Sequence, residues 1–326
     1  MPHAGRTGDD KGVLVILAPG QGAQTPGFLT GWLQVDVAAA ELARLSEVSG
    51  LDLVRHGTVS DADTIRDTAI AQPLLVAAAI ATARALFQAH EPRHGNADLL
   101  AGHSVGEISA AALTGVLSVE DAMVFVRERG QAMAAAAAVT PTGMSAVVGG
   151  KPDEVLARIA ECGLTAANNN GAGQIVAAGT LDRLQQLAGQ PPTRARVIPL
   201  QVAGAFHTAH MAPARVRLAG LATTLTSAAP ATGLLSNRDG RVIASGTEYL
   251  DRLVDQVTNP VRWDLCLQAM ADHGATGVLE LAPAGTLTGI VKRNLPGVAR
   301  FNLNTPDQLD DARDFCTAHA GTRRGK

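Results

Sequence analysis

"ADLLAGHSVGEISAAALTG", residues 97–115, is the stretch that decides the fold. Its apolar start, residues 97–104, predicts a short buried strand that runs into a turn. The rest, VGEISAAALTG, predicts a helix that ends at Gly115, because glycine is common just past a helix C-terminus. A buried strand that passes directly into a helix is typical of an α/β fold with a mostly parallel sheet.

The junction between this strand and this helix carries a candidate nucleophile. Gly102, Ser104 and Gly106 fit the pattern G-x-S-x-G, and the flanking strand and helix are the context that the pattern requires. The helix N-terminus offers backbone N–H groups, that of Val105 first, to a developing oxyanion. The pattern therefore predicts a nucleophilic Ser104. The alternative interpretation is a helix N-cap serine in a glycine-rich turn.

Other segments extend the α/β pattern in both directions. Residues 13–18, VLVILA, predict a strand buried on both faces of a parallel sheet. Residues 67–90 predict a long apolar helix that begins near Gln72-Pro73, since proline suits a first helical turn. Residues 276–283 predict a last buried strand. We therefore expect a large domain of helices around a mostly parallel sheet.

The pattern changes at TPTG, residues 140–143. From there the predicted order is strand, helix, strand, strand, helix, strand, which is the split β-α-β arrangement of ferredoxin-like domains. We expect four parts: a disordered tail at 1–12, a large, hydrolase-like α/β domain at 13–139 and 203–310, a ferredoxin-like small subdomain at 140–202, and a C-terminal helix end with a disordered tail at 311–326.

Charge and cysteine usage exclude several classes of protein. A net charge of −3 gives no hint of a nucleic-acid partner. The three cysteines are scattered without CxxC spacing, which predicts neither a disulfide framework nor a metal site and favours a reducing, cytoplasmic compartment. No secretory signal is visible, and no apolar run approaches the roughly 20 residues of a membrane helix, so no membrane association is expected.

A serine nucleophile needs a base, which is most often a histidine. Nine histidines are available, and spacing alone favours His207, in GAFHTAHM, only slightly over a purely structural role for it. An α/β-hydrolase places serine first, then an acid, then histidine near the C-terminus. Here more than a hundred residues follow His207, and the small subdomain separates it from Ser104. This order departs from the hydrolase plan.

Seven motifs occur in one order along the chain: PGQGAQ (19–24), GHSVGEISA (102–110), RERGQAM (127–133), NNNGAGQIVAAG (168–179), GAFHTAHM (204–211), NPVRW (259–263) and PAGTLTGIVKR (283–293). Together they cover about residues 13–307. The chain resembles the malonyl-CoA:acyl carrier protein transacylases of bacterial fatty acid synthesis and the related acyltransferase domains of polyketide synthases. Seven ordered motifs are far more specific than G-x-S-x-G alone.

The resemblance implies a role for individual residues. Ser104 would be the acylated nucleophile and His207 its general base. Arg129 would bind the malonyl carboxylate, since arginine is a permanently charged, bidentate partner; Arg127, two positions away, faces another side of the helix. The other implied site residues are Gln21 and the backbone N–H of Val105 for the oxyanion hole, Gln256 for orienting the histidine through its main-chain carbonyl, Phe206, Asn168 and Asn170 at the acyl cleft, and Lys292 and Arg293 as a patch for the carrier protein or CoA.

Phe206 bears on the choice of acyl group, because it directly precedes the implied base. Among polyketide acyltransferases, a phenylalanine at this position accompanies malonyl rather than methylmalonyl substrates. The ring would fill the space that an α-methyl group needs. The alternative interpretation is a core phenylalanine.

The resemblance also implies the reaction and its partners. Malonyl-CoA would acylate Ser104 and release CoA, and the phosphopantetheine thiol of an acidic acyl carrier protein would then take the malonyl group, with ping-pong kinetics. The enzyme would supply extender units for fatty acid synthesis. It would need no metal and no permanently bound cofactor, with malonyl-CoA as substrate, and a monomer is expected.

Other functions fit parts of the sequence. A serine thioesterase or hydrolase shares the turn around Ser104 but would not need Arg129. An acyltransferase that serves polyketide assembly in trans would carry the same motifs. An inactive carrier-binding module would show an altered serine or histidine, and a nucleotide site at PGQGAQ lacks the third glycine of G-x-G-x-x-G and a P-loop lysine.

Overall fold

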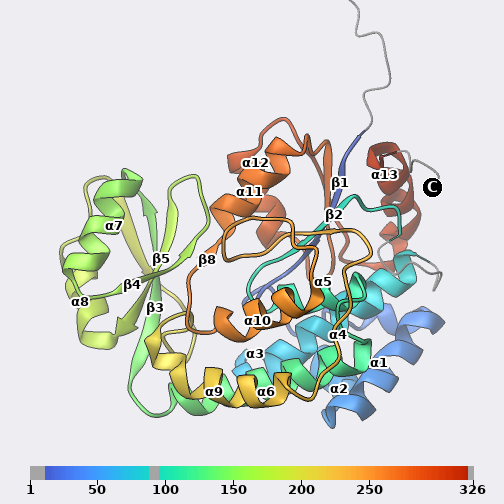
Figure 1. Ribbon diagram of the computed structural model, residues 1–326, viewed down its shortest axis with the longest axis horizontal. Coiled ribbons are helices and arrows are strands. Elements are labelled where there is room, and N and C mark those ends of the chain that lie inside the picture. Colours follow the sequence, from blue (N-terminus) through green and yellow to red (C-terminus); the bar gives the residue numbers. More distant parts are fainter. Residues whose placement is uncertain (1–11, 88–94, 322–326) are drawn as a thin grey trace, which may run out of the picture.

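A computed structural model of the chain describes residues 12–87 and 95–321. Figure 1 shows two parts beside each other, a larger one with most of the helices and a smaller one, drawn in green, with its own sheet. The terminal tails that the sequence predicts fall mostly at 1–11 and 322–326, outside the described residues.

The larger part is built on a parallel sheet. Its strands are β1 (Leu14–Ala18), β2 (Leu99–Gly102), β7 (Gly233–Leu234), β9 (Gly277–Glu280) and β10 (Ala299–Asn302). They lie in the order β10-β9-β1-β2-β7, and each pair of neighbours runs parallel. The predicted α/β fold with a mostly parallel sheet is confirmed.

The central strand β1 is buried on both faces, as its continuous apolar sequence predicts. Leu14 and Ile16 pack into the core on one side of the sheet, and Val15 and Leu17 pack on the other. The helices on the Leu14 side include α1 (Asp36–Ser49), α4 (Thr68–Leu86), α5 (Gly106–Leu113) and α6 (Val119–Ala137), and those on the Val15 side are α11 (Trp263–Asp272) and α12 (Thr286–Asn294).

Helix α4 begins earlier than the sequence suggests. Its predicted start near Gln72-Pro73 was wrong: the helix begins at Thr68, and the side chain of Asp67 caps it by accepting the N–H of Ala69 at 2.8 Å. Pro73 therefore lies inside the helix rather than in its first turn. The earlier start places Gln72 within the helix, where it is only 1% exposed.

Helix α4 is also long and apolar enough to cross a membrane by length and composition alone, contrary to the expectation that no apolar run is long enough. Within the fold, however, 83% of its most apolar window is buried. It packs against α1, α5 and α6. A helix that is apolar all round and surrounded by other helices is a core helix.

The smaller part follows the predicted order of elements. These are β3 (Thr142–Gly149), α7 (Pro152–Glu161), β4 (Thr165–Asn169), β5 (Gln174–Thr180), α8 (Leu181–Gly189) and β6 (Ala195–Pro199). The sheet order is β6-β3-β5-β4-β8, and the pairs among β3 to β6 are antiparallel. Strand β8 (Val261–Arg262) lies in the segment expected to belong to the large domain, yet it pairs with β4. A short strand of that segment thus extends the small sheet.

The remaining helical elements complete the larger part. They are α2 (Leu53–Thr58), α3 (Ala62–Arg66), α9 (Ala212–Ala222), α10 (Gly246–Gln256), α13 (Leu309–His319) and the 3₁₀ turns Gly31–Gln34, Ala209–Met211 and Pro306–Gln308. Helix α13 begins at Leu309 and so crosses residue 310, where the large domain is expected to end. Helices α1, α2 and α3 are not predicted from the sequence.

Candidate active site

Ser104 lies between the end of β2 and the start of α5, in the turn that the sequence predicts. Its φ is +53°, a strained conformation for a residue other than glycine and one found often at functional sites. A Cβ on Gly102 would lie 1.9 Å from the carbonyl carbon of Gly106, and a Cβ on Gly106 would lie 2.3 Å from the carbonyl oxygen of Ala18. The two glycines therefore let the helix approach the strands more closely than any side chain permits.

The hydroxyl of Ser104 meets the imidazole of His207, 103 residues further along the chain. Ser104 Oγ lies 2.8 Å from His207 Nε2. On the other side of the ring, Nδ1–H donates to the backbone carbonyl of Gln256 at 2.9 Å. Because a carbonyl oxygen only accepts, this bond puts the proton on Nδ1 and leaves Nε2 free to accept the serine proton. The pair has the geometry of a nucleophile and its general base.

His207 is buried and neutral. Burial, and after it the positive charge of Arg129, lower the pKa of His207 from 6.5 to about 3, although the carbonyl of Gln256 opposes the shift. The imidazole therefore carries no charge near neutral pH. A neutral imidazole is the form that can act as a base.

The guanidinium of Arg129 lies beside the hydroxyl of Ser104. The side chain is 1% exposed and donates to the side-chain carbonyls of Gln72 at 2.6 Å and Gln256 at 2.7 Å. It also donates to Ser104 Oγ at 3.3 Å. It makes no ion pair with a carboxylate in the described ranges, and burial lowers its pKa to about 10. Arg127, by contrast, points elsewhere and donates to the carbonyl of Ser49 at 3.4 Å.

A cavity extends from Ser104 between the two parts of the molecule. This inner cavity, of about 90 Å³, is lined by Gln21, Gln72, His103, Ser104, Val105, Arg129, Met133, Met144, Asn168, Leu200, Val202, Phe206 and His207. An adjoining outer cavity, of about 410 Å³, shares Gln21, His103, Asn168 and Leu200 with it, and its other lining residues are Gly20, Ala146, Asn170, Gln174, Val176, Gly285, Thr286, Leu287, Gly289, Ile290 and Arg293. The inner cavity suits a small acyl group, and the outer one suits a longer attached chain.

Two backbone N–H groups at the inner cavity, those of Gln21 and Val105, meet no acceptor within the described part of the chain. Gln21 follows β1 and Val105 follows β2, so both lie at the carboxyl ends of neighbouring parallel strands. Unpaired donors beside a nucleophile suit a developing oxyanion. The side chain of Gln21 has another partner, since it donates to the hydroxyl of Thr68 at 3.3 Å.

The other predicted cleft residues lie at these two cavities. Phe206 is 6% exposed and lines the inner cavity. Asn168 lines both cavities, and its buried Oδ1 has no hydrogen-bond partner in the described residues. Asn170 lines the outer cavity, where its Oδ1 lies 3.0 Å from Nε2 of His103. The imidazole of His103 thus contacts Asn170, and it lies in an edge-to-face arrangement with Trp263.

Lys292 and Arg293 are both exposed near the end of α12. Of the two, only Arg293 lines the outer cavity. Its guanidinium donates at 3.2 Å to the side chain of Gln174, which belongs to β5 of the smaller part. Lys292 does not line either cavity.

Three buried polar residues contact the site without having been predicted: Gln72, Glu107 and Asn237. Asn237 accepts the N–H of Ser104 at 2.7 Å and donates to the carbonyl of Gly102 at 2.8 Å, so it holds both ends of the turn. A signal for two of the three exists in the sequence. Gln72 is the one amide side chain of an apolar helical run, and Glu107 is the one charged residue of another, and such residues are buried with partners.

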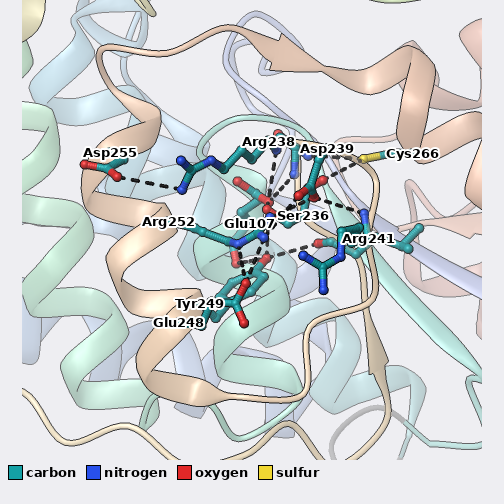
Figure 2. Close-up of polar contacts among 12 residues, drawn as sticks. Glu107, Ser236, Arg238, Asp239, Arg241, Glu248, Tyr249, Arg252, Asp255 and Cys266 are labelled. Atoms are coloured by element: carbon teal, nitrogen blue, oxygen red, sulfur yellow. Dashed lines mark hydrogen bonds and ion pairs between the residues drawn. The ribbon is translucent and has the colours of Figure 1, made fainter.

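Glu107 is the buried acid of the site, only 2% exposed. It accepts the backbone N–H of Asn237 at 2.6 Å, the side-chain amide of Gln256 and the hydroxyl of Tyr249. Figure 2 shows Tyr249 beside Glu107. Burial raises the pKa of Glu107 to about 7, although Asn237, Gln256 and the charge of Arg129 favour the ionised form.

Comparison with known proteins identifies the family. A family model described as an acyl transferase domain matches residues 15–311. The chain belongs to the acyl transferase family. This acyltransferase is 48% identical over 299 residues to a malonyl CoA-acyl carrier protein transacylase of Mycobacterium tuberculosis, covering 92% of this chain and 99% of the relative.

Solved structures agree with the sequence match. The crystal structure of MCAT from Mycobacterium tuberculosis matches the acyltransferase with a TM-score of 0.88 at 48% identity, covering 92% of this chain and 99% of that chain. A malonyl-transacylase in complex with its type II polyketide synthase acyl-carrier protein matches with a TM-score of 0.87 at 28% identity, covering 93% of this chain and 99% of that chain.

The acyltransferase brings a serine hydroxyl, a neutral imidazole, two free N–H donors and a buried cation to one cavity. This set fits acyl transfer through a covalent serine intermediate.

In residues 12–87 and 95–321, no group of three or more His, Cys, Asp or Glu side chains is arranged to hold a metal ion.

Proposed function

We propose that this acyltransferase moves a malonyl group from malonyl-CoA to the phosphopantetheine thiol of an acyl carrier protein, through a malonyl ester of Ser104. The curated relatives that match nearly the whole chain are named for this reaction. The observation that carries the proposal is Arg129, a buried cation beside Ser104 whose hydrogen-bond partners are amides and the serine hydroxyl.

Arg129 accounts for the choice of a dicarboxylic acyl group. A buried guanidinium without a carboxylate partner is costly, and a malonyl carboxylate supplies that partner. An acetyl group leaves the cation unpaired. We therefore expect the site to favour malonyl over acetyl by roughly 3 kcal/mol or more.

In the first half-reaction, Nε2 of His207 takes the proton of Ser104 Oγ as the oxygen attacks the thioester carbonyl carbon. The backbone N–H groups of Gln21 and Val105 donate to the resulting oxyanion. The carbon–sulfur bond then breaks, and the proton passes from His207 to the departing CoA thiolate. The products are CoA thiol and the malonyl ester of Ser104.

In the second half-reaction, the thiol of the carrier protein gives its proton to His207 and its sulfur attacks the ester carbonyl. The bond between that carbon and Ser104 Oγ breaks, and Oγ recovers the proton from His207. Release of CoA before the carrier protein binds gives ping-pong kinetics. A malonyl carboxylate held on Arg129 also fixes the ester in the inner cavity.

Substrate binding also strengthens the base. The positive charge of Arg129 is one of the causes that lower the pKa of His207. A malonyl carboxylate paired with Arg129 offsets that charge, so the pKa of His207 rises when malonyl is bound. The imidazolium that forms in the transition state is then less costly with malonyl than with acetyl.

The outer surface near α12 is proposed to receive the carrier protein or CoA. Lys292 and Arg293 are exposed there, and Arg293 lies at the outer cavity that adjoins the site. Both cations would attract the phosphates of CoA and an acidic carrier protein. Malonyl-CoA enters as substrate, and we propose no permanently bound cofactor.

We further propose a hydrolase-like large domain at 13–139 and 203–310 and a ferredoxin-like small subdomain at 140–202. The strand–turn–helix at Ser104, with its positive φ, supports a nucleophile elbow in the first. The strand order β6-β3-β5-β4 supports the ferredoxin-like assignment of the second.

Localisation and assembly are also proposals. The three cysteines are free and buried, which favours the reducing cytoplasm. A monomer is favoured because most of the exposed large apolar side chains of the described residues lie far apart in the sequence, and scattered exposed apolar residues are ordinary.

Fatty acid synthesis is the proposed pathway, and polyketide assembly is the second candidate. The second is favoured by the similarity to a malonyl-transacylase solved with a polyketide carrier protein. Transfer rates to purified fatty acid and polyketide carrier proteins distinguish the two. We expect the higher kcat/KM with the fatty acid carrier.

The test of the proposed specificity compares Arg129→Ala with Arg127→Ala. Arg129→Ala should lower kcat/KM for malonyl-CoA by about 100-fold or more and should leave that for acetyl-CoA equal or higher. Arg127→Ala, on the same helix, should leave both values within about twofold. Undiminished kcat/KM for malonyl-CoA in Arg129→Ala would refute the role proposed for Arg129.

A further inference from the structure

Glu107 lies in the first turn of α5, three residues after the nucleophile, and is buried. It touches neither cavity in front of Ser104. Its strongest contacts run instead to two residues that hold the site, Gln256 and Asn237. A buried acid with such contacts is well placed to position its neighbours.

The side-chain amide of Gln256 has only one orientation that satisfies its neighbours. Its Nε2 donates to the carboxylate of Glu107 and to the carbonyl of Ser104 at 3.1 Å. Its Oε1 consequently faces Arg129 and accepts from the guanidinium at 2.7 Å. If the amide were turned over, its NH₂ group would face the N–H groups of Arg129, and its oxygen would face a carboxylate.

We propose that Glu107 is a positioning residue that sets the side-chain amide of Gln256 so that Arg129 is held ready for the malonyl carboxylate. This inference rests on the proposed malonyl transfer. Glu107 acts through Gln256 and touches no reacting atom. The NH₂ group of Gln256 donates to both the carboxylate of Glu107 and the backbone carbonyl of Ser104. Without Glu107, only the carbonyl of Ser104 would remain to orient this amide.

The same arrangement keeps a negative charge near Arg129 but out of contact with it. The charge of Glu107 favours the charged form of Arg129 through space, whereas the atoms that touch the guanidinium are neutral oxygens. A carboxylate in direct contact would occupy the cation. One amide between the two charges lets Arg129 stay protonated and still accept a substrate carboxylate.

The charges behind Glu107 are paired with one another. A small cavity opens on this rear side and is lined by Glu107, Gln256, Arg252, Asp255 and other residues. Arg252 pairs with Asp239 at 2.7 Å and with Glu248 at 2.8 Å, as Figure 2 shows. In the described residues Glu107 itself makes no ion pair. Its carboxylate accepts hydrogen bonds from Asn237, Tyr249 and Gln256 instead.

A double-mutant cycle tests the inference. The variants are Glu107→Met, Arg129→Ala and the pair, and methionine keeps the length of the side chain without its acceptors. The readout is the ratio of kcat/KM for malonyl-CoA to that for acetyl-CoA, measured at roughly pH 8, where a carboxyl of pKa about 7 is mostly ionised. Because both donors are assayed on the same protein, the folded fraction cancels in the ratio.

We expect Glu107→Met to lower this ratio by about tenfold or more, and to change it no further when Arg129 is already alanine. A matched control is Glu41→Met, which removes another buried carboxyl, one paired with Arg44 on α1. It should leave the ratio unchanged. If Glu107→Met yields no folded protein, Glu107→Gln replaces one of the two acceptor oxygens by an NH₂ group, and it should lower the ratio in the wild-type background but not in a Gln256→Met background.

Two results would overturn the inference alone: an unchanged ratio in Glu107→Met, or an equal fall in the Arg129→Ala background. Either can occur while wild-type enzyme still prefers malonyl, which leaves the proposed function standing. A wild-type enzyme without any malonyl preference would overturn both.

Discussion

The guanidinium of Arg129 donates a 2.7 Å hydrogen bond to the neutral side-chain carbonyl of Gln256 rather than to a carboxylate. This relationship predicts the outcome of Gln256→Glu. The new carboxylate would pair directly with Arg129 and compete with the malonyl group, while the backbone carbonyl that orients His207 would remain. We expect kcat/KM for malonyl-CoA to fall by about 100-fold, and that for acetyl-CoA to fall much less.

The matched control for this change is Gln186→Glu, which adds the same charge on the exposed face of α8. It should leave both rates unchanged. Equal losses for malonyl-CoA and acetyl-CoA in Gln256→Glu would mean that the substitution damages the catalytic pair rather than the carboxylate site.

Asn237→Ala should weaken the turn that presents the nucleophile. The variant removes the acceptor of the Ser104 N–H at 2.7 Å and the donor to the carbonyl of Gly102 at 2.8 Å. Leaving buried groups unpaired costs about 1–3 kcal/mol for each group. We expect a lower unfolding free energy in urea and a fall in kcat that is equal for malonyl and acetyl donors. A change in the ratio of the two donors would assign Asn237 a role in specificity instead.

The pH dependence of activity should reflect the low pKa of His207. Burial lowers that pKa from 6.5 to about 3, so the base stays neutral at mildly acidic pH. The acid limb of kcat/KM for acetyl-CoA, which does not use the carboxylate site at Arg129, should therefore lie well below pH 6.5, since kcat/KM reports groups of the free enzyme. An apparent pKa near 6.5 in this profile would show that His207 is as easily protonated as an exposed histidine.

The free energy of unfolding should also depend on pH through His207. The pKa of His207 is lower in the folded chain than in the unfolded chain, so its contribution is present above pH 6.5 and is lost as the pH falls from 6.5 toward 3. The loss approaches about 1.4 kcal/mol per pH unit. Urea unfolding at several pH values should show a shallower acid dependence for His207→Ala than for wild type. Parallel curves would contradict the lowered pKa.

Gly106→Ala should be severely destabilising. The added Cβ would lie 2.3 Å from the backbone oxygen of Ala18, so the first turn of α5 must move away from β1. We expect a loss of about 2–4 kcal/mol in unfolding free energy, together with loss of acylation. Gly220→Ala on α9, where nothing lies within 4 Å of the added Cβ, should instead be neutral or stabilising by up to about 1 kcal/mol.

Local features of this chain are predictable from sequence. The turn at Ser104 is predicted by a strand, two glycines and a helix that follow one another within a few residues. The structure places the turn between β2 and α5, at the predicted position. The order of elements in the smaller part is likewise local, because each strand and helix has its own hydrophobic period. Helix α4 shows the limit: its start at Thr68 depends on a cap at Asp67, which outweighs the signal from Pro73.

The convergence of distant residues is not predictable in the same way. Among nine histidines, only the fold brings His207 within 2.8 Å of Ser104, and the resemblance to a family was needed to select it beforehand. The contacts of Asn237 and Glu107 depend on loops and helices that meet only in three dimensions. The position of Glu107 in an apolar run signals a buried polar residue but does not name its partners, and Asn237 carries no such signal.

The central claim is that Ser104 carries a malonyl group and passes it to a carrier protein. The most direct measurement is the intact mass of the purified protein after malonyl-CoA or acetyl-CoA, with and without a phosphopantetheinylated carrier protein. We expect a malonyl adduct that is absent in Ser104→Ala and that moves to the carrier protein when it is added. An adduct lost mainly to water would indicate a thioesterase, and no adduct from either donor would contradict the claim.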